Sequence, residues 1–139
     1  MTDLNYLAIA AATLAQFVVG AIWYMPLFGN LWGKIHCFDK YTAKEQKEMQ
    51  AQMMPLLLLQ LFFTAITSVV LAQMAAMNAN TSLYELAFWA WLGFVVPTQV
   101  SAVVFGNTEQ KWMVTKTAIM AGGSFACLMV AAFVFSLWR

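Results

Sequence analysis

Charged side chains are scarce in this chain of 139 residues. Lysine, arginine, aspartate and glutamate together make up 9% of it, against about 25% in an ordinary soluble domain. Hydrophobic residues make up 63%, and they gather into four runs, each long enough to cross a bilayer and each with at most one charge. Helices built from such runs have no continuous polar face to turn towards water. The composition therefore predicts an integral membrane protein with the lipid bilayer as its partner.

Histidine and cysteine are also scarce. The single histidine, His36, adjoins Cys37 in a polar segment, and Cys127 lies in the middle of an apolar run. Because a zinc site needs several ligands at suitable spacing, this pair predicts no metal and no cofactor. The different settings of the two cysteines make a disulfide unexpected. The net charge of +1, without a basic cluster, gives no sign of nucleic-acid binding.

Arrangements typical of catalysis are missing as well. No serine or cysteine stands in a spacing that would pair it with a base, and no glycine-rich phosphate loop follows a strand. Glu85 is the only acid within an apolar run, and it falls in the first turn of a helix, where it reaches the headgroups and complements the helix N-terminus. We therefore expect no catalytic residues and no enzyme.

The four apolar runs predict membrane-spanning helices at about 4–25, 55–77, 83–105 and 113–138, with a polar connection of about 27–54 after the first. Within that connection, Thr42-Ala43-Lys44-Glu45 has the pattern of a capping box, so a helical extension should begin there. Pro55 should either start the second span or kink a continuous helix. Short later connections favour antiparallel neighbours, with the third helix beside the second and fourth. The expected fold is all-α: a single domain of four antiparallel transmembrane helices, with a short interfacial helix and a cytoplasmic extension after the first span.

Positive charges are unevenly divided between the two ends of the spans. The first and third connections carry the lysines, and Arg139 alone falls on the opposite side; the lysines, including one at the adjoining helix end, are Lys34, Lys40, Lys44, Lys47, Lys111 and Lys116. By the positive-inside rule, these connections face the cytoplasm. We therefore expect both termini on the non-cytoplasmic side of the membrane.

An aromatic motif marks the end of the first span. It reads Gly20-x-x-Trp23-Tyr24-x-Pro26-x-Phe28-Gly29-x-x-Trp32. Because proline disfavours a helical residue before it, Pro26 should close the first helix. Apolar residues at helical spacing then predict a helix lying in the membrane interface, with Trp23 and Tyr24 in the aromatic belt. We expect an architectural role for this interface motif, with docking or ligand binding as the alternative.

The same motif resembles the opening signature of a family of small bacterial membrane proteins with four spans, known as a domain of unknown function. Trp91-Leu92-Gly93-Phe94-Val95-Val96-Pro97-Thr98 is similar to the third-helix signature of that family, and Leu137-Trp138 is similar to its ending. The resemblance covers nearly the whole chain and implies the four-span fold and a location in the bacterial cytoplasmic membrane. It implies no reaction, because none is assigned to the family.

Polar residues inside the apolar runs form the candidate site. They are Gln16, Gln60, Thr64, Thr98 and Gln99. One hypothesis is a polar seam that binds or conducts something small. The favoured one is hydrogen bonding between helices, because polar contacts between spans are common.

Two stripes of small residues predict close helix packing. Gly20 continues a stripe on the first helix, and Ala118, Gly122 and Ala126 form another on the fourth. We expect the two stripes to pack together, with contact to another subunit as the alternative. The sequence thus favours a non-enzymatic accessory, assembly or self-associating module, as a homo-oligomer or within a larger membrane complex. The alternative function is a small-solute transporter or channel.

Overall fold

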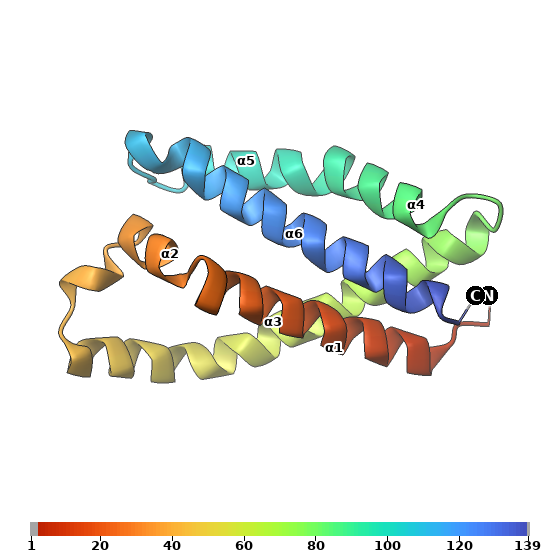
Figure 1. Ribbon diagram of the computed structural model, residues 1–139, viewed down its shortest axis with the longest axis horizontal. Coiled ribbons are helices and arrows are strands. Elements are labelled where there is room, and N and C mark those ends of the chain that lie inside the picture. Colours follow the sequence, from red (N-terminus) through yellow and green to blue (C-terminus); the bar gives the residue numbers. More distant parts are fainter. Residues whose placement is uncertain (1–2, 139) are drawn as a thin grey trace.

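The computed structural model describes residues 3–138 and contains only helices and turns in that range. Figure 1 labels six α-helices: α1 Tyr6–Ile22, α2 Gly29–Ile35, α3 Ala43–Met77, α4 Leu83–Ala90, α5 Val96–Phe105 and α6 Met113–Ser136. Short π-helical turns follow α1 and α4, namely η1 Trp23–Leu27 and η3 Trp91–Val95, and the 3-10 turns η2 Phe38–Lys40 and η4 Gln110–Trp112 precede α3 and α6. Four stretches are long and apolar enough to cross a membrane: Tyr6–Leu27, Ala43–Met77, Leu83–Phe105 and Gln110–Ser136. The all-helical fold with four long apolar helices agrees with the sequence-based prediction.

Helix caps form where polar residues precede an apolar run. The Asn5 side chain accepts a hydrogen bond from the Ala8 amide at 3.1 Å and so caps α1. At the start of α3, the Thr42 amide donates to the Glu45 carboxylate at 2.9 Å, and the Glu45 amide donates to the Thr42 hydroxyl at 3.3 Å. The predicted capping box is confirmed. These bonds satisfy amides that the first helical turn leaves without a backbone partner.

One continuous helix, α3, unites the polar extension with the second apolar run. Pro55 lies inside it, so the sequence-based alternative of a continuous helix is the one observed. At about 1.5 Å per residue, 35 residues extend about 52 Å, well beyond a hydrocarbon core of about 30 Å. Residues 47–60 are all exposed, and Figure 1 shows this yellow half of α3 standing apart from the other helices.

The core of the molecule is organised around α6. In Figure 1, α6 lies between α4 and α5 on one side and α1 on the other, and α1 also packs against α3. Alanines, branched aliphatic residues and one phenylalanine make this core: Ala8, Ile9, Ala12, Leu71, Leu83, Ala87, Leu128, Ala131, Ala132 and Phe135. Both ends of the chain lie at the same end of the molecule, opposite α2 and the turn between α5 and α6.

The third apolar helix differs from expectation in its neighbours. Its segments α4, η3 and α5 all pack along α6, whereas its contact with α3 is mainly through α4, next to the connecting turn. Sequence reasoning placed this helix beside the second and the fourth, and the structure has it mainly along the fourth. The buried face of α3, which carries Ser68 and Leu71, is taken by α1 instead.

Candidate functional site

A row of polar side chains, which we call the polar spine, follows one face of α3 and continues onto α1. Gln60, Thr64 and Ser68 are four residues apart and therefore share a helix face. The Thr64 hydroxyl donates to the Gln60 carbonyl at 2.8 Å, and the Ser68 hydroxyl donates to the Thr64 carbonyl at 3.1 Å. From α1, Gln16 Nε2 donates to Ser68 Oγ at 2.7 Å, and Thr13 Oγ1 lies 3.0 Å from the same oxygen.

The two ends of the polar spine differ in burial. Ser68 is fully buried, and Gln16 and Thr13 are 4% and 7% exposed, so the end between α1 and α3 is closed and hydrogen-bonded. Gln60 is exposed, and within residues 3–138 its side-chain amide reaches only Thr64 Oγ1, at 3.4 Å. Ser68 was missed by sequence reasoning. The four-residue step from Thr64 would have pointed to Ser68.

The other two candidate polar residues lie elsewhere, on α5. Gln99 Nε2 donates to Ser124 Oγ on α6, and Gln99 Oε1 is buried with no hydrogen-bond partner among the described residues. Thr98 is exposed, and its hydroxyl donates to the Phe94 carbonyl of its own helix at 2.6 Å. Within residues 3–138, no hydrogen bond joins this pair to the polar spine. The structure therefore divides the five candidate residues between two places.

The aromatic motif after α1 turns inwards. Trp23 Nε1 donates to the Ile119 carbonyl of α6 at 2.9 Å. Its indole lies so close to α6 that a Cβ on Gly122 would be 2.8 Å from Trp23 Cζ2, and one on Gly123 would be 3.0 Å from Trp23 Cδ1. The two glycines therefore make room for the ring. The indole N–H of Trp23, which the sequence analysis expected in an aromatic belt, is thus bonded to a neighbouring helix of the same chain.

The proline of the motif does not end the helix where the sequence analysis placed the end. Pro26 lies inside η1, which continues α1 as a π-helical turn up to Leu27. The helical path breaks at Phe28, whose φ is −119°, and α2 begins at the next residue. Proline fits this wider turn because its ring and its missing N–H disfavour the regular four-residue hydrogen bond of an α-helix.

The aromatic rings of the motif pack on one another. The ring centres of Trp23 and Phe28 are 4.8 Å apart, and those of Tyr24 and Trp32 are 4.9 Å apart. A Cβ on Gly29 would lie 3.2 Å from the Tyr24 carbonyl oxygen, so this glycine allows the close approach of α2 to η1. These contacts join α1 and α2 through the motif that the sequence analysis singled out.

A second tryptophan, Trp91, joins the third apolar helix to α6 by a hydrogen bond, as Trp23 joins the first. Trp91 begins η3, and its Nε1 donates to the Ala121 carbonyl of α6 at 2.8 Å. Its ring centre lies 5.0 Å from that of Phe125. Sequence reasoning did not select Trp91 as a site residue. The shared arrangement, a tryptophan followed by a proline within an apolar run, was the available signal.

The small-residue stripes behave in part as expected. Gly20 of α1 approaches Cys127 of α6, with 3.9 Å between the position of an added Cβ and Cys127 Sγ. Gly122 contacts the Trp23 ring rather than the stripe on α1. Ala118 is exposed and Ala126 is half-buried. The close packing of α1 and η1 on α6 thus uses Gly20, Gly122 and Gly123, whereas Ala118 remains exposed.

Comparison with known proteins places the chain in a family. Residues 7–136 match the family described as a protein of unknown function (DUF1761). The chain belongs to this family. No curated protein and no solved structure matches it. DUF1761 membership agrees with the resemblance seen in the aromatic motif, and it assigns no reaction to the polar spine or the tryptophans.

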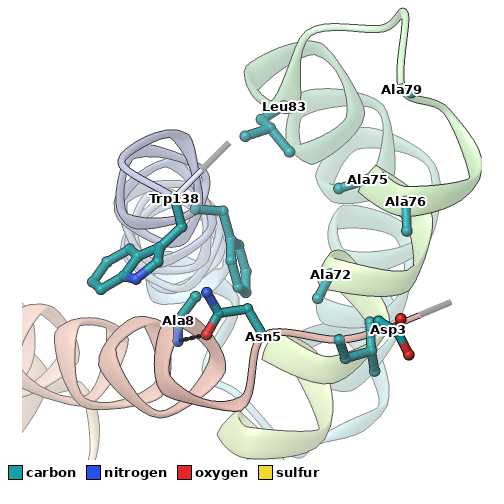
Figure 2. Close-up of a pocket in the computed structure, with 11 residues that line it drawn as sticks. Asp3, Asn5, Ala8, Ala72, Ala75, Ala76, Ala79, Leu83 and Trp138 are labelled. Carbon is teal, nitrogen blue, oxygen red and sulfur yellow. Dashed lines mark hydrogen bonds between the residues drawn. The ribbon is translucent and has the colours of Figure 1, made fainter.

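A pocket of about 280 Å³ opens in this DUF1761 protein at the end where both termini lie. Figure 2 shows one wall, formed by Ala72, Ala75 and Ala76 of α3 and by Ala79 of the turn after it, facing α1 and the end of α6. The Oδ1 atom of Asn5 is already bonded to the Ala8 amide. The pocket is therefore lined mainly by methyl groups and suits an apolar occupant.

Metal-ligating side chains do not gather in the described part of the chain. Residues 3–138 hold no group of three or more histidine, cysteine or acidic side chains placed to share an ion. Cys37 and Cys127 are both free, and His36 Nδ1 lies 2.9 Å from the Trp32 carbonyl oxygen.

Proposed function

We propose that this chain is a multi-pass protein of the bacterial cytoplasmic membrane, acting without catalysis as an accessory, assembly or self-associating module. The observation that carries the proposal is how little apolar surface the chain covers by itself. In the apolar stretch of α3 only 11% of the residues are buried, and in that of the Leu83–Phe105 helix only 6%. Exposed apolar patches of more than a few hundred Å² are rare on soluble monomers, so lipid and other helices are the fitting partners.

The distribution of charge supports an antiparallel bundle with its lysine-rich end in the cytoplasm. The lysine-bearing segments, α2 with the start of α3 and the turn before α6, lie at one end of Figure 1. Both termini lie at the other end, together with Glu85 at the start of α4. Under the positive-inside rule, this arrangement puts both termini outside the cytoplasm and leaves α2 at the cytoplasmic surface.

The open end of the polar spine supports self-association. Gln60 is exposed among apolar residues of α3, with Leu56, Leu59 and Phe63 exposed around it. A side-chain amide in hydrocarbon is stabilised by a hydrogen-bonding partner on a neighbouring helix. A second copy presents the same amide, which can both donate and accept, so a two-fold contact at Gln60 satisfies both chains.

Purification from native membranes in mild detergent tests this proposal. Native mass spectrometry and crosslinking before extraction should find a homo-oligomer or a bound partner protein. Replacing Gln60 with leucine should weaken self-association about threefold, because interhelical hydrogen bonds in membranes average about 0.6 kcal/mol. Gln52→Leu, in the exposed extension of the same helix, is the matched control. A strictly monomeric protein with silent crosslinks in membranes would refute the proposal.

The second candidate function is a small-solute transporter or channel, and the polar spine is the observation in its favour. A path along Gln60, Thr64 and Ser68 would run between α1 and α3, and a second copy would be needed to close its outer side. Proteoliposomes challenged with a panel of small osmolytes test this idea. Transport should fall when Thr64 is replaced by valine, and unchanged shrinkage kinetics relative to empty liposomes for every osmolyte would rule it out.

A further inference from the structure

We propose that Lys116, Thr108 and Trp32 form a binding site for the phosphate of a membrane phospholipid. Lys116 lies in the first turn of α6, about one turn inside the fourth apolar stretch. Its Nζ is 3.4 Å from Thr108 Oγ1 and 5.9 Å from the centre of the Trp32 ring. The proposal rests on the membrane location proposed above.

The charge of Lys116 is not balanced by the protein. The one ion pair found in residues 3–138 joins Lys111 Nζ to Glu109 Oε2 at 3.3 Å, on the exposed side of the same turn. Lys116 is half-buried and forms no such pair within those residues. An ammonium group has three N–H donors, and the long contact to Thr108 occupies one of them. Two donors thus remain for an anion.

The surroundings of Lys116 suit a phosphate at the membrane surface. Trp32 comes from α2, and Thr108 comes from the turn between α5 and α6, so the site lies where two connections meet. The Trp32 ring is held in place by Tyr24 and His36, whose ring centres lie 4.9 and 4.5 Å away. Tryptophan favours headgroup depth, and lysine near that depth attracts anionic lipid. The Thr108 oxygen accepts a hydrogen bond from Lys116, so its own O–H can donate to a phosphate oxygen beside the ammonium.

The bland alternative is that Lys116 extends to bulk water and binds nothing. Lysine side chains near helix ends commonly do so. Only a site with bound phosphate predicts a lipid preference that depends on this one lysine and not on its exposed neighbour. That difference can be measured.

The test is native mass spectrometry of the full chain, purified in detergent from the membrane fraction and titrated with phosphatidylglycerol. Separate arms use phosphatidylcholine and inorganic phosphate. Lys116→Gln should lower phosphatidylglycerol affinity about fivefold, the factor that one lysine near the surface contributes. Lys111→Gln is the matched control, because its lysine is exposed and paired, and it should leave the affinity nearly unchanged. Lys116→Arg, which keeps the charge, should retain binding.

Several outcomes overturn the proposal. Equal losses in Lys116→Gln and Lys111→Gln would mean diffuse attraction rather than a site. Displacement of the lipid by millimolar inorganic phosphate would make the free anion the ligand. If Lys116→Gln does not fold, Thr108→Val carries the test, and unchanged affinity there refutes the site. A chain found in the soluble fraction contradicts the proposed membrane function instead, so the two failures are distinguishable.

Discussion

The contact between Trp23 and the two glycines of α6 leads to a sharp prediction for Gly122→Ala. A Cβ at this position would lie 2.8 Å from Trp23 Cζ2 and 3.2 Å from Trp23 Cη2. The indole cannot retreat freely, because its Nε1 is bonded to the Ile119 carbonyl and Phe28 packs on its ring. Inserting a methyl group into a packed site costs about 1–3 kcal/mol.

Gly93→Ala is the matched control, because nothing lies within 4 Å of the position of its added Cβ. Both substitutions gain about 1 kcal/mol of helix propensity, so this term cancels when the two variants are compared. The free energy of unfolding of Gly122→Ala should therefore be about 1–3 kcal/mol lower than that of Gly93→Ala. The measurement is equilibrium unfolding in mixed micelles, followed by circular dichroism.

A double-mutant cycle checks the cause. Phenylalanine at position 23 lacks the outer ring atoms that meet the new methyl group, so in a Trp23→Phe background the added cost of Gly122→Ala should fall below about 0.5 kcal/mol. Equal stability of Gly122→Ala and Gly93→Ala in the wild-type background would refute the reasoning. It would mean that Trp23 is free to move and does not hold α1 on α6.

Three further substitutions test other contacts. Ser68→Ala removes the acceptor shared by two α1 side chains and should cost about 1–2 kcal/mol in the same unfolding assay, whereas Thr67→Ala, whose hydroxyl bonds only within α3, should cost almost nothing. Trp91→Phe keeps a ring but loses the hydrogen bond to α6, so it should lower the free energy of unfolding by about 0.6 kcal/mol. An unchanged free energy of unfolding, or a decrease above about 1.7 kcal/mol, would contradict the assignment of this effect to the hydrogen bond. Thr42→Ala should cost about 1 kcal/mol locally, seen as faster hydrogen exchange confined to the first turn of α3.

Much of the fold could be predicted because it depends on local pattern. Apolar runs and charge gaps locate four helices, and the capping box at Thr42 places the start of α3 correctly. The continuity of α3 through Pro55 remained ambiguous, because the choice between a kink and a new helix depends on contacts that no local pattern encodes. The partner of each helix depends equally on distant residues, so the sequence did not show that α1, rather than the third apolar helix, covers the face of α3 around Ser68.

The candidate site was only partly predictable for the same reason. Gln16, Gln60 and Thr64 stood out as polar residues in apolar runs, and they do belong to one spine. Gln99 stood out on the same ground, yet its partner lies on α6. The hydrogen bond of Trp23 to α6 could not be predicted, because the Ile119 carbonyl and the space over Gly122 come close to Trp23 only in three dimensions.

The two tryptophans that contact α6 are tied to proline through the same backbone device. In η1 the Phe28 amide donates to the Trp23 carbonyl, and after η3 the Val96 amide donates to the Trp91 carbonyl, so each tryptophan accepts a bond across five residues. Pro26 lies inside η1, and Pro97 follows η3 in the first turn of α5; the ring and the missing N–H of proline disfavour the regular four-residue bond. The extra residue in each turn shifts the chain locally. In both turns the first residue is the tryptophan whose indole N–H donates to a carbonyl of α6. Since the two carbonyls are only two residues apart, both outer helices hold α6 at one level, and displacement of α6 along its axis would break both bonds together.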